Sequence, residues 1–392
     1  LVLQIIRAAG PLSRAEIARR LHLSRPTASR IIDTLEQAGF ITRTGKSLPT
    51  GGRLGELYSF REDAGFVLAL ELGTREARIA IANLNGEIVA RAARILQLEA
   101  RDSVLPQISL FVNDTIDHFS EPSAKILSLG VAVPGIVHST PDAGSGYIDA
   151  AKVFQGLNDR PLQRELEHLF HLPVSMENDV NLAAIGECQF GCAQGQKNVV
   201  YLFVGRGIGA GLILDEKLFR GNTEAAGEVG NMVVDRPHLY QTFGTRGCLE
   251  ALASIDQIVT ASKAAESSGT SDEADTSVEA FCRRALAGEP HARATIHIIV
   301  EYLAVAIINL VAVIDPGIVV FGGDLSELPH AEELFVQPIA QLMKQHIGDN
   351  PQLRLSQLKG DASLYGAVQA AISEVLNTTH IPVAESNGRV EI

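Results

Sequence analysis

The sequence predicts an α/β protein in two unequal parts, a winged helix-turn-helix at residues 1–62 and a larger body at residues 65–385. Capped helical patterns followed by two strand-like runs predict the first part. Buried strand-like runs that alternate with helical stretches predict the second. The polar residues 386–392 are expected to form a tail beyond both parts.

Charge divides the chain at the same place. Residues 1–62 contain 10 Lys and Arg against 5 Asp and Glu, whereas the remainder contains 23 against 41, and the whole chain carries −13. A basic module on an acidic body indicates a nucleic-acid partner at one end only. The longest apolar stretch, residues 296–314, contains Glu301 and is expected to be a buried helix, so no membrane contact is predicted.

Two helices are predicted from their start and stop signals. Ser13 and Glu16 fit a capping box, in which the hydroxyl accepts from the helix and the carboxylate reaches back to the cap. The next helix begins after Ser24, with Pro26 in its first turn, where a missing N–H does no harm. Gly39 is expected to end it in a left-handed conformation.

The second helix is the candidate recognition helix. Its apolar positions at helical spacing face the core of the module: Ala28, Ile31, Ile32 and Leu35. The opposite side of its first turns is expected to reach base edges in a major groove through Arg25, Thr27, Ser29 and Arg30.

A wing is predicted after the recognition helix. Residues 40–43 and 56–60 could pair as two strands, and the Gly-rich loop between them carries Lys46 and Arg53, which suit phosphate or minor-groove contacts. The helix, turn, cap, helix and wing together favour DNA binding. The alternatives are a small helical protein-interaction module and a helical domain whose arginines are simply solvated.

The body is expected to contain strands at residues 66–72, 77–82, 87–91, 127–133, 174–176, 198–204, 210–214 and 317–321. Motifs that contain candidate functional residues lie at or between the ends of these strands: Glu71–Thr74, Glu177–Asn181, Gly205–Gly211, Gly227–Asn231 with Gly244–Glu250, and Asp315–Gly323. The glycine-rich run between two strands would allow close backbone approach to a phosphate.

The ordered set of motifs resembles the ROK family of repressors, open reading frames and kinases, and the attached N-terminal module resembles its repressor branch. The resemblance implies a two-lobed, actin-like (ribonuclease H-like) sugar-kinase fold around a sugar cleft, and self-association as a dimer or tetramer. It also implies sugar contacts from Asn178, Asp179, Glu228, Asn231 and Glu250, with Asp179 at the position of the kinase base. The alternatives are that Asn178 and Asp179 cap a helix and that the glutamates lie on the surface.

Departures from the kinase pattern argue against catalysis. Glu71 replaces the aspartate of the first phosphate loop, Arg75 would fill phosphate space, and Arg206 replaces a small hydroxyl residue. Val153 replaces an asparagine of the sugar site. The positions of the family's structural zinc ligands read Asn231, Gln241, Phe243 and Cys248, so no metal is expected. Cys188 and Cys192 are expected to be inert core residues.

The sequence therefore predicts a cytoplasmic DNA-binding regulator, most simply a repressor of carbohydrate genes, that binds operator DNA and a sugar or sugar derivative and needs no cofactor. An active sugar kinase with a fused DNA-binding domain is the alternative, and retained Asp179 favours it. A third possibility is that the body docks a sugar-transport protein. The direction of the response to sugar stays open.

Overall fold

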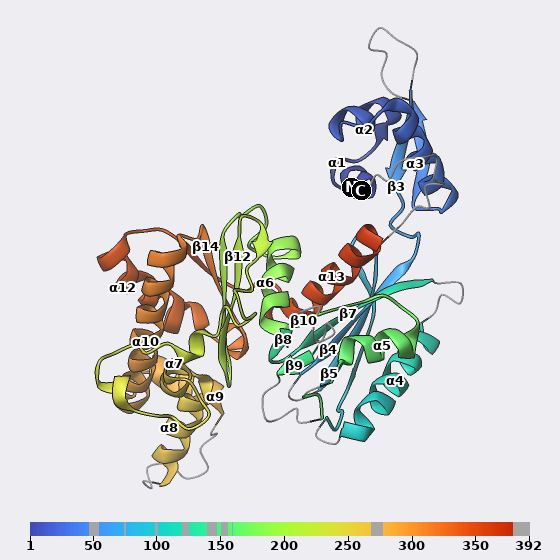
Figure 1. Cartoon of the computed structure of the whole chain (residues 1–392). Coiled ribbons are helices and arrows are strands. Elements are labelled where there is room, and N and C mark those ends of the chain that lie inside the picture. Colours follow the sequence, from blue (N-terminus) through green and yellow to red (C-terminus); the bar gives the residue numbers. More distant parts are fainter. Residues whose placement is uncertain are drawn as a thin grey trace.

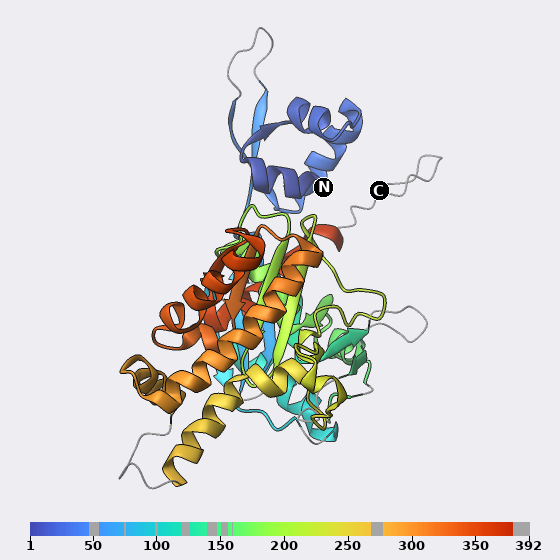
Figure 2. The ribbon, with the colours of Figure 1, turned by 90° about the vertical axis from the view of Figure 1, so that its left-hand side faces the viewer.

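The computed structural model describes residues 1–46, 55–73, 76–98, 101–119, 125–138, 147–149, 156–158, 160–267 and 277–378. A small N-terminal head, comprising residues 1–46 and 55–60, sits at one end of a two-lobed body (Figures 1 and 2). Thr74, Arg75, Val153, Arg53 and the polar tail lie outside the described residues.

The head is a three-helix module with a three-stranded sheet of order β1-β3-β2. Its elements are α1 (Val2–Ala9), β1 (Leu12–Ser13), α2 (Arg14–Arg20), α3 (Arg25–Gln37), β2 (Ile41–Lys46) and β3 (Glu56–Phe60). The predicted wing strands pair antiparallel. The predicted apolar face of α3 is also present, because Ala28, Ile32 and Leu35 are buried.

The predicted helix caps at Ser13, Ser24 and Gly39 are confirmed, but the predicted role of Glu16 is wrong. The Ser13 hydroxyl accepts from the Glu16 backbone N–H at 3.3 Å, and the Ser24 hydroxyl accepts from Thr27 N–H at 3.2 Å. Gly39 has the expected positive φ, +82°. The Glu16 carboxylate, however, accepts from Arg20 at 2.8 Å instead of reaching back to the cap. An ion pair one turn along the helix offers it a charged partner.

Lobe 1 is built on a five-stranded sheet of order β10-β7-β4-β5-β6. Its elements are β4 (Phe66–Leu72), β5 (Ala77–Asn83), β6 (Ile88–Arg94), α4 (Arg101–Asp117), β7 (Ile126–Val133), β8 (Ile136–His138), β9 (Tyr147–Asp149), α5 (Leu162–Phe170) and β10 (Val174–Asn178). The short strands β8 and β9 form a separate hairpin. Helix α6 (Asp179–Phe190) follows β10 directly and leads to the second lobe.

Lobe 2 is built on a five-stranded sheet of order β13-β12-β11-β14-β15. Its strands are β11 (Val199–Val204), β12 (Ile208–Leu214), β13 (Lys217–Leu218), β14 (Ile318–Gly322) and β15 (Gln352–Leu355). Its helices and turns are η2 (Val229–Asn231), η3 (Pro237–Tyr240), α7 (Cys248–Ala253), α8 (Ile255–Ser267), α9 (Val278–Leu286), α10 (Pro290–Ile314), α11 (Asp324–Glu327), η4 (Glu332–Val336), α12 (Gln337–Ile347) and η5 (Lys359–Asp361), before the final helix α13 (Ala362–Thr378).

Helix α10 is the predicted apolar helix, and it is only half buried. Leu303 and Ile307 lie in the core of lobe 2, whereas Ile298, Val305 and Val313 are exposed on its outer face. Of the described helices, it alone is long and apolar enough to cross a membrane, with 44% of its most apolar window buried. A core helix of a water-soluble protein passes the same test, so this is weak evidence for a membrane span.

The two lobes are joined by helices that cross at their junction. Helix α13 packs on strands β4, β7 and β10 of lobe 1, and α6 packs on β11 and β12 of lobe 2. The crossing is close because glycines occupy the contact. A Cβ on Gly366 would lie 1.9 Å from the carbonyl oxygen of Leu182, and one on Gly186 would lie 2.3 Å from that of Ala362.

Helix α13 also reaches the head. Its end lies below the head in Figure 1, where the Gln4 side chain of α1 donates to the Asn377 side chain at 3.3 Å. Leu3 and Ile6 of α1 belong to the same apolar cluster as Val375 and Leu376 of α13. The core of the head is therefore continuous with the core of lobe 1.

Replacing Gly366 with alanine is expected to lower the free energy of unfolding by about 1–3 kcal/mol, because overpacking forces two helix backbones apart. Gly360→Ala is the matched control, since its Cβ would make an ordinary 3.6 Å contact. Chemical denaturation of both variants measures the difference. Equal stabilities would show that the crossing is not tightly constrained.

Candidate DNA-binding surface and ligand cleft

The outward face of α3 carries the predicted base-reading residues. Arg25 and Arg30 are exposed. Thr27 is half-buried, and its hydroxyl lies 2.7 Å from that of Ser24, so it also belongs to the helix cap. Lys46 is exposed at the end of β2, where the wing loop begins.

Arg14, which the sequence did not single out, fixes the recognition helix to the rest of the head. Its guanidinium donates to the buried Tyr58 hydroxyl at 2.9 Å, to the Ser29 hydroxyl at 2.9 Å and to the Asp33 carboxylate at 2.5 Å. Asp33, its strongest hydrogen-bond partner, raises the pKa of Arg14 further. Ser29 is thus held from within the head, and its hydroxyl keeps a proton to donate outward.

The arginines of the head fall into two groups. Arg20 pairs with Glu16, and Arg43 pairs with Glu36 and Glu56. No ion pair joins Arg25, Arg30 or Arg7 to a carboxylate among the described residues, but Arg7 lies on α1 and donates to the Asn85 carbonyl at 3.4 Å. Unneutralised cations on the first turns of an exposed helix are what a phosphate- or base-binding surface requires.

The amino end of α6 forms one wall of the candidate ligand cleft. The Asn178 side chain caps this helix: its oxygen accepts from Val180 N–H at 2.9 Å and Asn181 N–H at 3.0 Å, and its nitrogen donates to the Gly135 carbonyl at 3.0 Å. The capping alternative is therefore realised for Asn178. Its amide retains one N–H for a ligand.

Asp179 is the first residue of α6, and the pKa of its carboxyl is raised. Removal from water, followed by the negative charge of Glu71 and then that of Glu228, raises its pKa from 3.8 to about 7. Its carboxylate accepts from the Val180 N–H at 2.9 Å. A carboxyl that titrates near neutrality can accept from or donate to a sugar hydroxyl.

Lobe 2 supplies the other predicted ligand residues. Glu228 precedes the short turn η2, and Asn231 ends it, both exposed. Glu250, on α7, accepts weakly from the Ile208 N–H at 3.4 Å and lies against Gly230 of the same turn. Glu228 and Asn231 flank the turn against which Glu250 packs. A Cβ on Gly209 would lie 3.6 Å from the Val180 side chain of α6 and 4.0 Å from the Gly227 carbonyl oxygen, so the residue before Glu228 lies near the amino end of α6.

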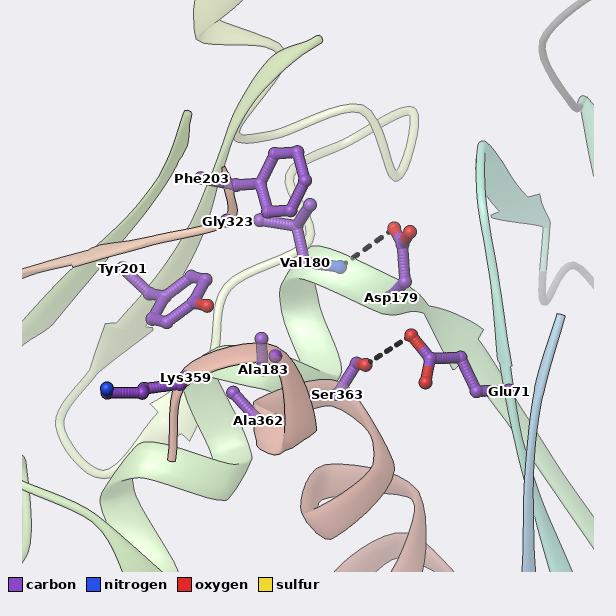
Figure 3. A pocket seen from close by; sticks show the side chains of 11 residues that line it. Glu71, Asp179, Val180, Ala183, Tyr201, Phe203, Gly323, Lys359, Ala362 and Ser363 are labelled. Carbon is purple, nitrogen blue, oxygen red and sulfur yellow. Dashed lines mark hydrogen bonds between the residues drawn. The ribbon is translucent and has the colours of Figure 1, made fainter. Parts of the chain in front are cut away.

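The first phosphate-loop position is occupied by a bonded glutamate. Glu71 accepts from the Ser363 hydroxyl at 2.8 Å and from Arg78 Nε at 2.7 Å, and burial raises its pKa. Figure 3 shows the small cavity between Glu71 and Ser363 on one side and Tyr201 and Phe203 on the other. Its volume of about 70 Å³ leaves room for a few waters.

The second phosphate loop closes on itself. Gly205 N–H donates to the Gly207 carbonyl at 2.9 Å, so this amide is already satisfied. The exposed Arg206 side chain lies 3.7 Å from Asp256. Asp256 also pairs with Arg246. The loop thus exposes an arginine where the kinase pattern has a small hydroxyl.

The residues at the zinc positions do not fit zinc. Phe243 packs its ring on His238, with centroids 5.7 Å apart, and Cys248 is buried at the start of α7. His238 lies 2.6 Å from Asp235. A structural zinc needs four nitrogen or sulfur donors, which these positions lack. The described residues contain no group of three candidate metal ligands.

Cys188 and Cys192 are free and half-buried. Cys188 lies on α6, whereas Cys192 lies two residues beyond the end of that helix. Burial, with a smaller contribution from Glu187, raises the thiol pKa of Cys188 to about 11 and that of Cys192 to about 12. Both thiols are therefore protonated, and hence unreactive, at neutral pH.

Comparison with known proteins identifies relatives for both parts. The ROK family model matches residues 67–374, and the MarR family model matches residues 1–47. The chain is 27% identical over 389 residues to the xylose repressor of Caldicellulosiruptor bescii, covering 96% of each protein. It is 23% identical to the DNA-binding transcriptional repressor Mlc of Escherichia coli, covering 83% of this chain and 80% of that protein.

Solved structures confirm the predicted fold class. A ROK family transcriptional regulator, described as a homologue of the E. coli Mlc protein, matches with a TM-score of 0.80 at 24% identity, covering 96% of both chains. The ROK hexokinase of Thermus thermophilus matches with a TM-score of 0.65 at 27% identity, covering 80% of this chain and 99% of that one. The regulator is thus matched over more of the chain than the kinase.

Asp179→Asn is expected to stabilise the protein increasingly as pH rises from about 4 to about 7. The folded chain holds the Asp179 proton more tightly than the unfolded chain, so ionisation costs wild-type stability across this window. Asparagine keeps the Val180 hydrogen bond without the charge. Melting temperatures of both proteins against pH measure the difference, with the exposed Asp215→Asn as control. Parallel curves would show that Asp179 titrates normally.

Proposed function

Because the chain belongs to the ROK family, we propose that it is a transcription repressor of carbohydrate genes, controlled by a sugar or sugar derivative bound between the lobes. One observation carries the proposal: Arg25 and Arg30 project from the exposed start of α3 without a carboxylate partner among the described residues, while Arg14, Arg20 and Arg43 are neutralised within the head. Thr27, Ser29, Lys46 and Arg53 complete the proposed DNA contacts.

A dimer would place two recognition helices on half-sites roughly 34 Å or a multiple apart. The working compartment is the cytoplasm, where operator DNA is found. The carboxylates and amides of Asn178, Asp179, Glu228, Asn231 and Glu250 suit adjacent sugar hydroxyls. The name of the C. bescii relative makes xylose the first effector to test.

The same cleft favours binding without phosphate transfer. The Glu71 carboxylate is committed to Arg78 and Ser363, and the Gly205 amide is committed within its own turn. The Gly205 amide is therefore not free to donate to a nucleotide phosphate, and the Glu71 carboxylate is already paired with a cation. An active kinase remains the second candidate, because Asp179, at the kinase base position, has a pKa of about 7, suited to accepting a hydroxyl proton.

Helix α13 offers the route from cleft to DNA. Ser363 at its start bonds Glu71 beside the cleft, and Asn377 at its end bonds Gln4 of the head. A ligand that prefers one arrangement of the lobes would shift α13 and so change the spacing of two heads in a dimer.

DNA binding is testable by fluorescence anisotropy on duplexes selected from a random library by the full chain. Affinity should fall steeply with salt. Arg30→Ala should cost about 1–3 kcal/mol and change sequence preference, whereas Lys46→Ala or Arg53→Ala should weaken all sequences and reduce the salt slope by about 1. The exposed body variant Arg293→Ala is the control. Indistinguishable binding by all four variants would disprove the assigned DNA surface.

Ligand binding is testable by thermal shift with a panel of mono- and disaccharides that includes D-xylose. A bound sugar should raise the melting temperature, and Glu228→Gln should abolish the rise, while the exposed Glu216→Gln should not. Calorimetry with Mg-ATP should show no binding. Saturable ATP binding with sugar-dependent hydrolysis would establish the kinase alternative instead.

A further inference from the structure

An ion pair joins the two lobes next to the amino end of α6. Arg220 Nε donates to the Glu177 carboxylate at 2.6 Å. Glu177 belongs to β10 of lobe 1, while Arg220 lies just beyond β13 of lobe 2. The Glu177 side chain is 10% exposed and that of Arg220 is 47% exposed, so the pair is largely sheltered on the carboxylate side.

Glu177 is tied to the ligand wall as well as to Arg220. Its other carboxylate oxygen accepts from the Asn178 N–H at 2.9 Å and from the Asn181 side chain at 3.1 Å. One buried carboxylate therefore orients the start of α6, which carries Asp179, and receives the arginine of the opposite lobe. Charge-assisted bonds of this kind are the stronger class of hydrogen bond.

Arg220 begins the loop that ends at Glu228. The Arg220 carbonyl accepts from the Ala226 N–H at 3.0 Å, which folds the loop back on itself. At the loop's end, Gly227 has a φ of +95°, and a Cβ there would lie 1.9 Å from the Ala210 carbonyl oxygen. The loop is thus folded back on itself and its end packs closely on β12 of lobe 2, where the Ala210 N–H donates to the Gly227 carbonyl at 2.8 Å. An ion pair at Arg220 therefore ties this loop as a unit to β10 of lobe 1.

We propose that Arg220 is a positioning residue for the ligand cleft: by clasping Glu177 it holds the loop of residues 220–228, and with it Glu228, against the amino end of α6. The clasp thereby sets how closely the lobes approach around a sugar. This inference rests on the proposed function for its ligand, but the clasp itself does not depend on a ligand.

The first test needs no ligand. Amide hydrogen exchange is measured on the full chain for wild type, Arg220→Gln, Arg220→Lys and the exposed control Arg293→Gln. Arg220→Gln should speed exchange in residues 220–232 by about fivefold or more, with the rest of lobe 2 unchanged, and the lysine variant should restore most of the protection. Unchanged exchange in Arg220→Gln, or loss of protection throughout the chain, would overturn the clasp.

The second test uses D-xylose and the same sugar panel in titration calorimetry. Arg220→Gln should weaken binding of whichever sugar binds wild type by about tenfold, because the cleft is less well preorganised. Glu177→Gln should weaken it too, and the double variant should be no weaker than the worse single variant, because both act through one contact. Additive losses or unchanged sugar affinity would refute the positioning role.

The two tests separate this inference from the proposed function. If no sugar binds wild type, the effector part of the proposed function fails, and the exchange experiment still decides whether the clasp exists. If a sugar binds wild type and Arg220→Gln equally, the proposed function stands and the positioning role falls.

Discussion

The crossing of α6 and α13 is the constraint on which the body depends. Each helix covers the sheet of one lobe and contacts the other helix at the junction, and both glycines at the crossing face a backbone carbonyl of the partner helix. Any side chain at Gly186 or Gly366 would separate the helices. The separation would move the start of α6, where Asp179 lies, relative to the Ser363 end of α13. The geometry of the cleft therefore depends on how closely α6 and α13 pack.

Helix α13 also connects the head to the body. The core of the head includes Leu3 and Ile6, which share a cluster with Val375 and Leu376 of α13. An apolar contact resists small shifts because packed side chains interlock. Under the proposed function, a movement of α13 would reach α1 through this shared cluster and the Gln4–Asn377 hydrogen bond.

Local patterns made much of the fold predictable. The strands of lobe 1 near residues 66–72 and 77–82, the Ser13 and Ser24 caps and the Gly39 turn all follow from residues close together in sequence. The strands β8, β9, β13 and β15 were not predicted, since two to four residues show no period. The Arg14–Tyr58 and Glu177–Arg220 contacts join residues more than 40 positions apart, and no spacing rule signals them.

The cleft residues show where residue type alone is insufficient. Asn178 matches both a helix cap and a sugar ligand, and only the geometry shows that its oxygen is already used. Glu71 differs from the kinase pattern, and only the geometry shows what the new side chain does. Its longer side chain reaches Ser363 and Arg78, and Arg78 in turn donates to the Gly360 carbonyl just before α13. Under the proposed function, the glutamate that replaces the aspartate of the first phosphate-loop motif also anchors the helix that carries the signal. Loss of transfer chemistry and gain of mechanical coupling would then have the same physical origin.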